Sequence, residues 1–69
     1  MSKKTALSYN IKKYRDKKSI SQDKLSKLAG VTLHTITKIE SGATVDPRIE
    51  TIKKIAGALD IKVDELIRD

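Results

Sequence analysis

The spacing of the apolar residues restricts this chain to helices almost everywhere. Apolar side chains recur three and four residues apart along its length, which is the period of an α-helix that buries one face. Only residues 19–21 and 42–45 could be read as extended, and both stretches are too short to build a sheet. The sequence therefore predicts an all-α domain.

The same spacing predicts five helices, at approximately residues 5–17, 21–29, 32–41, 47–59 and 63–67. One face of each helix should carry its apolar residues into a shared core. The residues expected on these faces are Leu7, Ile11, Tyr14, Leu25, Leu28, Ala29, Ile36, Ile39, Ile49, Ile52, Ile55, Ala56, Leu59, Val63, Leu66 and Ile67.

Capping residues mark the second and third of these helices. Ser21 and Thr32 are N-cap candidates, because a hydroxyl can accept a hydrogen bond from an unpaired backbone N–H of the first turn. Gly30 and Gly42 stand where each helix should end, and glycine readily takes the positive φ of such a turn. These signals predict two short helices joined by a tight turn.

Size and composition indicate how the domain is held together. The 69 residues allow a single domain, with residues 1–4 as a flexible basic tail. The sequence contains no cysteine and only one histidine, so neither a disulfide nor a histidine–cysteine metal site can staple the core. No apolar run has the length of a signal peptide core or a membrane span. We interpret the chain as a soluble, cytoplasmic domain without cofactors.

Positive charge is concentrated in the first part of the chain. The net charge is +6, and residues 1–40 hold ten basic and three acidic residues against five and six in residues 41–69. A domain with one basic half favours an anionic partner such as nucleic acid. The alternative is an ordinary solvated surface, because lysine-rich helices are common in small soluble proteins.

Residues 21–40 satisfy the geometric requirement for a helix-turn-helix, two short helices joined by a turn that contains glycine. Leu25 and Ala29 would pack the first of them, while Ile36 and Ile39 would anchor the second. The remaining face of the second helix is polar except for Leu33. A helix with such a face can lie in the major groove of DNA, which is wide enough to admit it.

The chain resembles the phage-repressor and Cro type of helix-turn-helix regulators, also called the XRE-like family. The resemblance covers about residues 7–67, and the order and spacing of several short stretches carry it. These stretches are Ile20-Ser21-Gln22 with Leu25, Ala29-Gly30-Val31-Thr32, Thr35 to Gly42, Ile49 to Ile52, Lys54-Ile55-Ala56, Ala58-Leu59 and Val63 to Leu66.

The resemblance implies a five-helix, lambda-repressor-like domain in which the second and third helices bind DNA. Gln22 would reach a phosphate and brace the reading helix, whereas Arg15 and Glu40 would form a structural ion pair between the first and third helices. Thr32 and Thr35 would lie close to backbone or base edges. The positions that usually read bases in this family are occupied here by Leu33, His34 and Lys38.

Two positions depart from the usual pattern of the family. Leu33 stands near a position that is often polar or basic, and leucine can touch a thymine methyl group but cannot hydrogen-bond a base. Asp60 stands where glycine is usual after the fourth helix, and Asp tolerates left-handed backbone geometry less well than Gly. We therefore expect the turn at Asp60 to differ.

The expected function is a sequence-specific regulator of transcription, a repressor that binds double-stranded DNA as a weak dimer or pairs on it. Any interface would use the last two helices, with Ile61 or Ile67 exposed. Surface roles without DNA remain the alternatives for His34, Lys38 and Gln22. The rival functions are an antitoxin that neutralises a toxin protein and a protein-interaction module. No catalytic arrangement or phosphate loop suggests an enzyme, and a lone histidine does not suggest a metal site.

Overall fold

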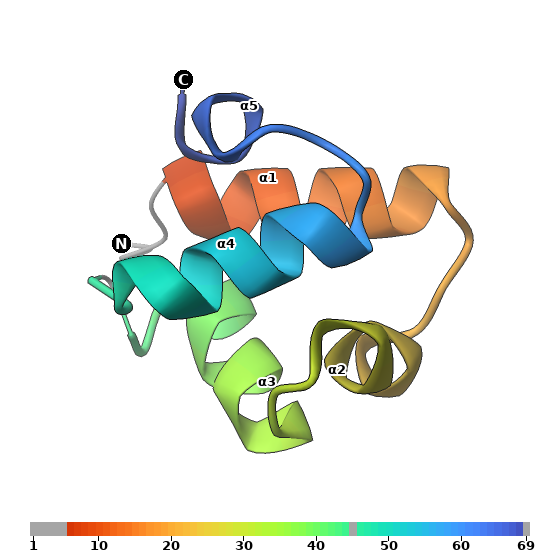
Figure 1. The fold of residues 1–69 in the computed structure, drawn as a ribbon. Coiled ribbons are helices and arrows are strands. Elements are labelled where there is room, and N and C mark those ends of the chain that lie inside the picture. The colour runs from red at the N-terminus through yellow and green to blue at the C-terminus, as the bar shows by residue number, and fades with distance from the viewer. Residues whose placement is uncertain (1–5, 45, 69) are drawn as a thin grey trace.

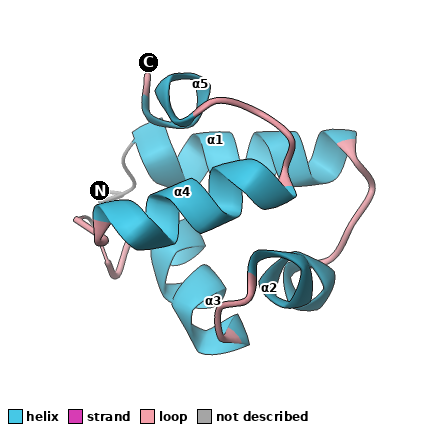
Figure 2. Cartoon of the chain, viewed as in Figure 1, coloured by secondary structure: helices cyan, strands magenta, loops and turns pink. Residues whose placement is uncertain are grey.

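The computed structural model describes residues 6–44 and 46–68, and every regular element within them is a helix (Figures 1 and 2). The proposed tail at residues 1–4 and the expected helix start at Thr5 lie outside the described residues. The five helices confirm the all-α prediction. They are α1 (Ala6–Lys17), α2 (Gln22–Ala29), α3 (Leu33–Ser41), α4 (Ile49–Ala58) and α5 (Val63–Ile67).

One apolar core lies between the helices. In Figure 1, α4 crosses in front of α1, while α2 and α3 form the lower part of the domain and α5 lies above α1. Each helix contributes its apolar face, as the spacing predicted, and a core of this kind is the main source of stability. The side chains without measurable exposure are Ile11, Leu25, Ile36, Ile55, Leu59 and Leu66. No described helix has the length and apolar character needed to cross a membrane.

Three residues expected in the core are instead exposed. Leu28, Ile49 and Ile67 expose 54%, 55% and 46% of their surface, respectively. The buried face of α2 is centred on Leu25, Ser26 and Ala29, and the helical period of 100° per residue turns Leu28 away from that centre. Ile49 and Ile67 are the first residue of α4 and the last of α5, beyond the contact between the helices.

The predicted caps are confirmed. The Ser21 hydroxyl accepts the Lys24 N–H at 3.0 Å, and the Thr32 hydroxyl accepts the Thr35 N–H at 3.1 Å. Gly30 and Gly42 close α2 and α3 in the left-handed conformation, with φ of 72° and 87°. The expectation that the turn at Asp60 would differ is wrong for its backbone, because Asp60 also takes the left-handed conformation, with φ of 60°. The turn at Gly30 and the cap at Thr32 therefore define where α2 ends and where α3 begins.

Asn10 joins the two ends of the fold. Its buried side-chain amide donates to the carbonyl oxygens of Leu66 at 2.9 Å and Arg68 at 2.7 Å. The last carbonyls of a helix have no partner within it, so these bonds satisfy groups at the end of α5. The two bonds thereby hold Asn10 to residues that lie 56 and 58 positions further along the sequence.

Replacing Gly30 with valine should lower the free energy of unfolding by about 1–2 kcal/mol, the cost of left-handed geometry for a residue with a Cβ atom. A Cβ atom at Gly30 would meet nothing within 4 Å, so strain in the backbone and not a steric clash is the cause. Thermal unfolding followed by circular dichroism measures the change, at about 4–8 °C for each kcal/mol. Gly57→Ala, in the last turn of α4, is the matched control and should not lower the melting temperature, because a Cβ atom there also meets nothing within 4 Å. Equal melting temperatures for Gly30→Val and the unaltered chain would contradict this account of the turn.

Candidate functional site

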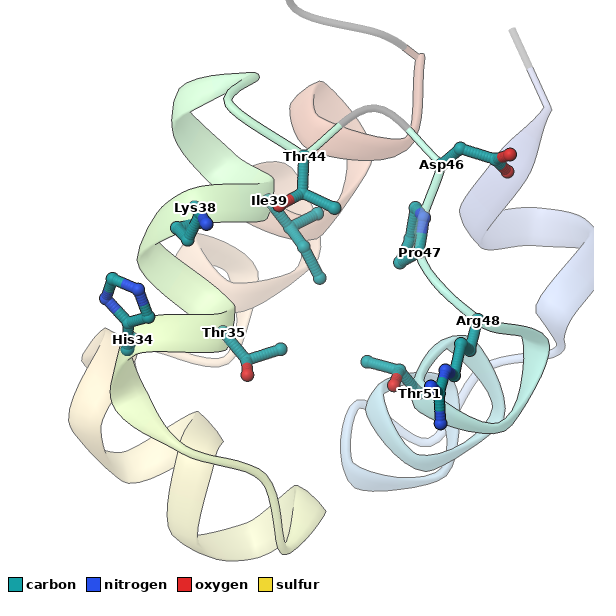
Figure 3. A pocket seen from close by; sticks show the side chains of 9 residues that line it. All are labelled: His34, Thr35, Lys38, Ile39, Thr44, Asp46, Pro47, Arg48 and Thr51. Carbon is teal, nitrogen blue, oxygen red and sulfur yellow. The ribbon is translucent and has the colours of Figure 1, made fainter.

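The α3 helix has one face in the core and the opposite face in solvent. Ile36, Ile39 and Glu40 are buried, whereas His34 and Lys38 are exposed. Because residues four positions apart lie on the same side of a helix, His34 and Lys38 form one outward surface. Figure 3 shows both side chains projecting from the same side of α3, away from the rest of the domain.

The position of α3 is set by hydrogen bonds that converge on the buried carboxylate of Glu40. Arg15 of α1 donates to it through Nε at 2.8 Å and through Nη2 at 3.1 Å. Gln22 of α2 donates to the same carboxylate through Nε2 at 3.1 Å. One carboxylate therefore links three helices. Because the guanidinium bonds both carboxylate oxygens, the pair fixes the relative orientation of the two side chains in addition to attracting them by charge.

The ion pair also favours the charged form of its basic partner, Arg15. The hydrogen bond from Arg15 to Glu40, and secondarily the negative charge of Glu40 and Asp16, raise the pKa of Arg15 above its ordinary value, while burial opposes this rise. Arg15 additionally donates from Nη1 to the Ile20 carbonyl oxygen at 2.9 Å, in the segment that connects α1 to α2. The pair with Glu40 and the bond to Ile20 thus both use the charged guanidinium of Arg15.

The threonine hydroxyls of α3 are engaged within the helix itself. Thr32 and Thr35 share a hydrogen bond between their Oγ1 atoms at 2.8 Å, in addition to the cap. The Thr37 hydroxyl donates to the His34 carbonyl oxygen at 2.9 Å. Among the described residues, Leu33, His34 and Lys38 have no side-chain hydrogen bond or ion pair. These three side chains are available to a ligand.

An open hollow of about 380 Å³ lies between α3 and the start of α4. Thr35 points into this hollow, and Thr51 and Arg48 face it from α4 and its N-cap (Figure 3). Asp46 also belongs to its rim but points away from α3 in the same view. The complete lining is His34, Thr35, Lys38, Ile39, Thr44, Asp46, Pro47, Arg48 and Thr51.

Sequence reasoning had not singled out Arg48. It is the N-cap residue of α4, it is exposed, and its side chain makes no cap hydrogen bond. A cation at this end of a helix opposes the helix dipole, so a basic residue here does not serve the helix. That mismatch was a signal in the sequence, and the hollow shows that Arg48 shares a surface with His34 and Lys38.

The predicted site residues thus fall into two groups. His34, Thr35 and Lys38 lie together along the hollow, with Leu33 at the start of the same helix. Gln22 and Thr32 serve the support of α3, through Glu40 and through the N-cap. No group of three or more metal-ligating residues occurs among residues 6–44 and 46–68. The described site is a convex, polar helix face beside an open hollow, which suits an extended ligand better than an enclosed small molecule.

The sequence pattern of the family described as Helix-turn-helix matches residues 11–66. The HTH-type transcriptional regulator SinR of Bacillus licheniformis is 32% identical over 59 residues, which are 86% of this chain and 53% of that protein. SinR of Bacillus subtilis is 33% identical over 57 residues, which are 83% of this chain and 51% of that protein. The chain therefore spans about half the length of these curated relatives.

Solved structures give the same picture. The N-terminal DNA-binding domain of SinR from Bacillus subtilis superposes with a TM-score of 0.88 and 30% identity, covering 91% of each chain. The restriction-modification controller protein C.AhdI from Aeromonas hydrophila superposes with a TM-score of 0.85 and 28% identity, covering 91% of this chain and 94% of that one. The arrangement of all five helices is shared with these proteins.

Proposed function

This chain belongs to the helix-turn-helix family, and from that membership we propose that it binds double-stranded DNA at a specific sequence and regulates transcription as a repressor. The observation that carries the proposal is the outer face of α3, whose side chains have no role within the fold. A buried network anchored at Glu40 holds that face rigidly, which reduces the entropic cost of binding. The reading helix of the domain is α3, and the major groove is its binding site.

Each exposed side chain suits a different part of the groove. His34 can donate or accept a hydrogen bond at a base edge, and it lies one helical turn from Lys38. Lys38 carries a flexible positive charge that suits a guanine edge or a phosphate. Because Thr32 and Thr35 hydroxyls are used in the cap, these residues contribute through shape and through the ordering of the first turn.

Gln22 is proposed both to support α3 and to contact a DNA phosphate. Its amide nitrogen is bonded to Glu40, and its place in the first turn of α2 puts it beside unpaired backbone N–H groups. A helix N-terminus favours a phosphate through these groups and through its dipole. Gln22 would thus brace α3 and help to seat a phosphate at the start of α2.

Arg48, at the N-cap of α4 and across the hollow from α3, is proposed as a phosphate contact. Replacement by glutamine should weaken binding of all sequences by similar factors, because phosphates carry no sequence information. The slope of log K against log salt concentration should become shallower by about 0.9, the value for one lost phosphate contact. A salt titration followed by fluorescence anisotropy measures this slope. The matched control is Lys53→Gln, which removes a charge from the exposed surface of α4 outside the hollow; equal slopes for the two variants would remove Arg48 from the interface.

We propose that two copies pair, either weakly in solution or only on DNA. Ile67 and Ile49 are exposed at the ends of α5 and α4, whereas Ile61 is partly buried against the core. The exposed isoleucines would supply the apolar part of the contact. Two-fold pairing suits a palindromic site with half-sites about one helical turn apart.

Selection of bound sites from a random duplex DNA library tests the proposed function. We expect enrichment of a palindrome, whose spacing would report a dimer. Enrichment of a single half-site would support DNA reading but contradict pairing. No enrichment at moderate salt would overturn the proposal in favour of a protein partner, such as the toxin of an antitoxin system.

A further inference from the structure

Leu33 is a large apolar side chain that the fold does not use. It is the first residue of α3 and exposes 42% of its surface. It belongs neither to the buried core nor to the partly buried hydrophobic residues packed against it. The apolar contribution of α3 to the core comes from Ile36 and Ile39, so Leu33 is apolar without a structural reason.

We propose that Leu33 recognises the C5-methyl group of a pyrimidine in the major groove, so that the binding site contains a thymine opposite it. This inference rests on the proposed function. The methyl group of thymine is the apolar feature that distinguishes base pairs in the major groove, where the other recognition atoms are hydrogen-bond donors and acceptors. A leucine among polar neighbours therefore has one complementary group in that groove.

The structure holds Leu33 where such a contact is made. In a helix-turn-helix, residues near the N-terminus of the reading helix approach the base edges. The turn that carries Leu33 is closed by Thr32, whose hydroxyl caps the helix and is bonded to Thr35. His34 follows at the next position, 100° further round the helix. An apolar contact and a polar contact can therefore fall on neighbouring base pairs.

The chain supplies its own control in Leu28. This leucine is likewise exposed, at 54%, and is likewise absent from the core and from the residues packed against it. It lies on α2, which supports the reading helix. Leu28→Ala therefore removes at least as much exposed apolar surface as Leu33→Ala, and leaves the outer face of α3 unchanged.

The test replaces each thymine of the selected site, one at a time, by deoxyuridine. The two bases have the same hydrogen-bonding edges and differ only in the methyl group. For the unaltered chain we expect one position in each half-site at which the change weakens binding about three- to fourfold, the effect of losing one buried methyl group. Leu33→Ala should bind the thymine duplex more weakly and show no further loss with uracil, whereas Leu28→Ala should retain the discrimination.

Two results would overturn the inference while leaving the proposed function intact. The first is a selected site in which no thymine is sensitive to the change. The second is discrimination that persists in Leu33→Ala, which would assign the methyl contact to another side chain. Failure to select any site would instead remove the proposed function, and this inference with it.

Discussion

Replacement of Lys38 by glutamate is expected to weaken DNA binding by about a hundredfold or more, with no change in helical content. The substitution removes a contact of about 1–3 kcal/mol and places a negative charge against the phosphate backbone. Lys38 is exposed and has no ion pair among the described residues, so the fold loses only the favourable interaction of a cation with the C-terminal end of the α3 dipole, about 0.3–1 kcal/mol. Fluorescence anisotropy with the selected duplex at fixed salt measures the affinity, and far-ultraviolet circular dichroism measures the helical content.

The control for this prediction is Lys53→Glu, which makes the same change of charge on α4. Lys53 is exposed and does not line the hollow beside α3. Its effect should be confined to the long-range field, which salt screens over about 8–10 Å, and should be several times smaller. Equal losses for the two variants would show that net charge and not the face of α3 determines binding.

The largest effect on stability is expected from Arg15→Leu, at about 3–5 kcal/mol of unfolding free energy. The substitution leaves the Glu40 carboxylate buried, at 6% exposure, with the amide of Gln22 as its one remaining side-chain donor among the described residues. Small domains have about 5–15 kcal/mol in total, so much of the stability would be lost. Urea unfolding followed by circular dichroism measures the change.

The reason for this loss is the unpaired carboxylate, and a second variant separates it from the loss of packing. Arg15→Leu combined with Glu40→Leu removes both charges and should recover part of the stability. Lys12→Leu, which breaks an exposed pair with Asp16, should cost no more than about 1 kcal/mol. A single Arg15→Leu variant as stable as Lys12→Leu would contradict the role given to the buried pair.

The effect of Arg15 on stability should not vary with pH across the neutral range. Its pKa is raised in the folded chain by the hydrogen bond to Glu40. A basic group whose pKa is raised by folding stabilises the fold fully at pH values below its pKa in the unfolded chain. It loses this contribution only as the pH rises through its pKa in the folded chain. Both values lie at strongly alkaline pH, so the contribution of Arg15 persists throughout ordinary conditions.

Local chemistry explains which parts of the fold the sequence predicts. The caps at Ser21 and Thr32 and the turn at Gly30 depend on residues within a few positions, and their conformations follow the predictions. Leu28 and Ile49 were wrongly placed in the core, and Ile67, expected both on a core face and at an exposed interface, is exposed. A spacing of three or four identifies an apolar stripe, but the centre of the buried face depends on neighbouring helices.

Parts of the site depend on contacts that no local pattern encodes. Asn10 binds carbonyl groups 56 and 58 positions away, which become its partners only when α5 packs on α1. Arg48 joins the surface of His34 and Lys38 only because the start of α4 lies across the hollow from α3. The face of α3 itself could be predicted, because a helix determines which of its residues point the same way.

The central claim is that α3 enters the major groove, and nuclear magnetic resonance of the isotope-labelled chain bound to the selected duplex tests it most directly. The account predicts intermolecular nuclear Overhauser effects from the Leu33 methyl groups and the His34 ring to major-groove protons, thymine methyl groups among them. It predicts none from the outer surface of α5. Contacts from α1 or α5 to the bases, with no effect at α3, would contradict the account.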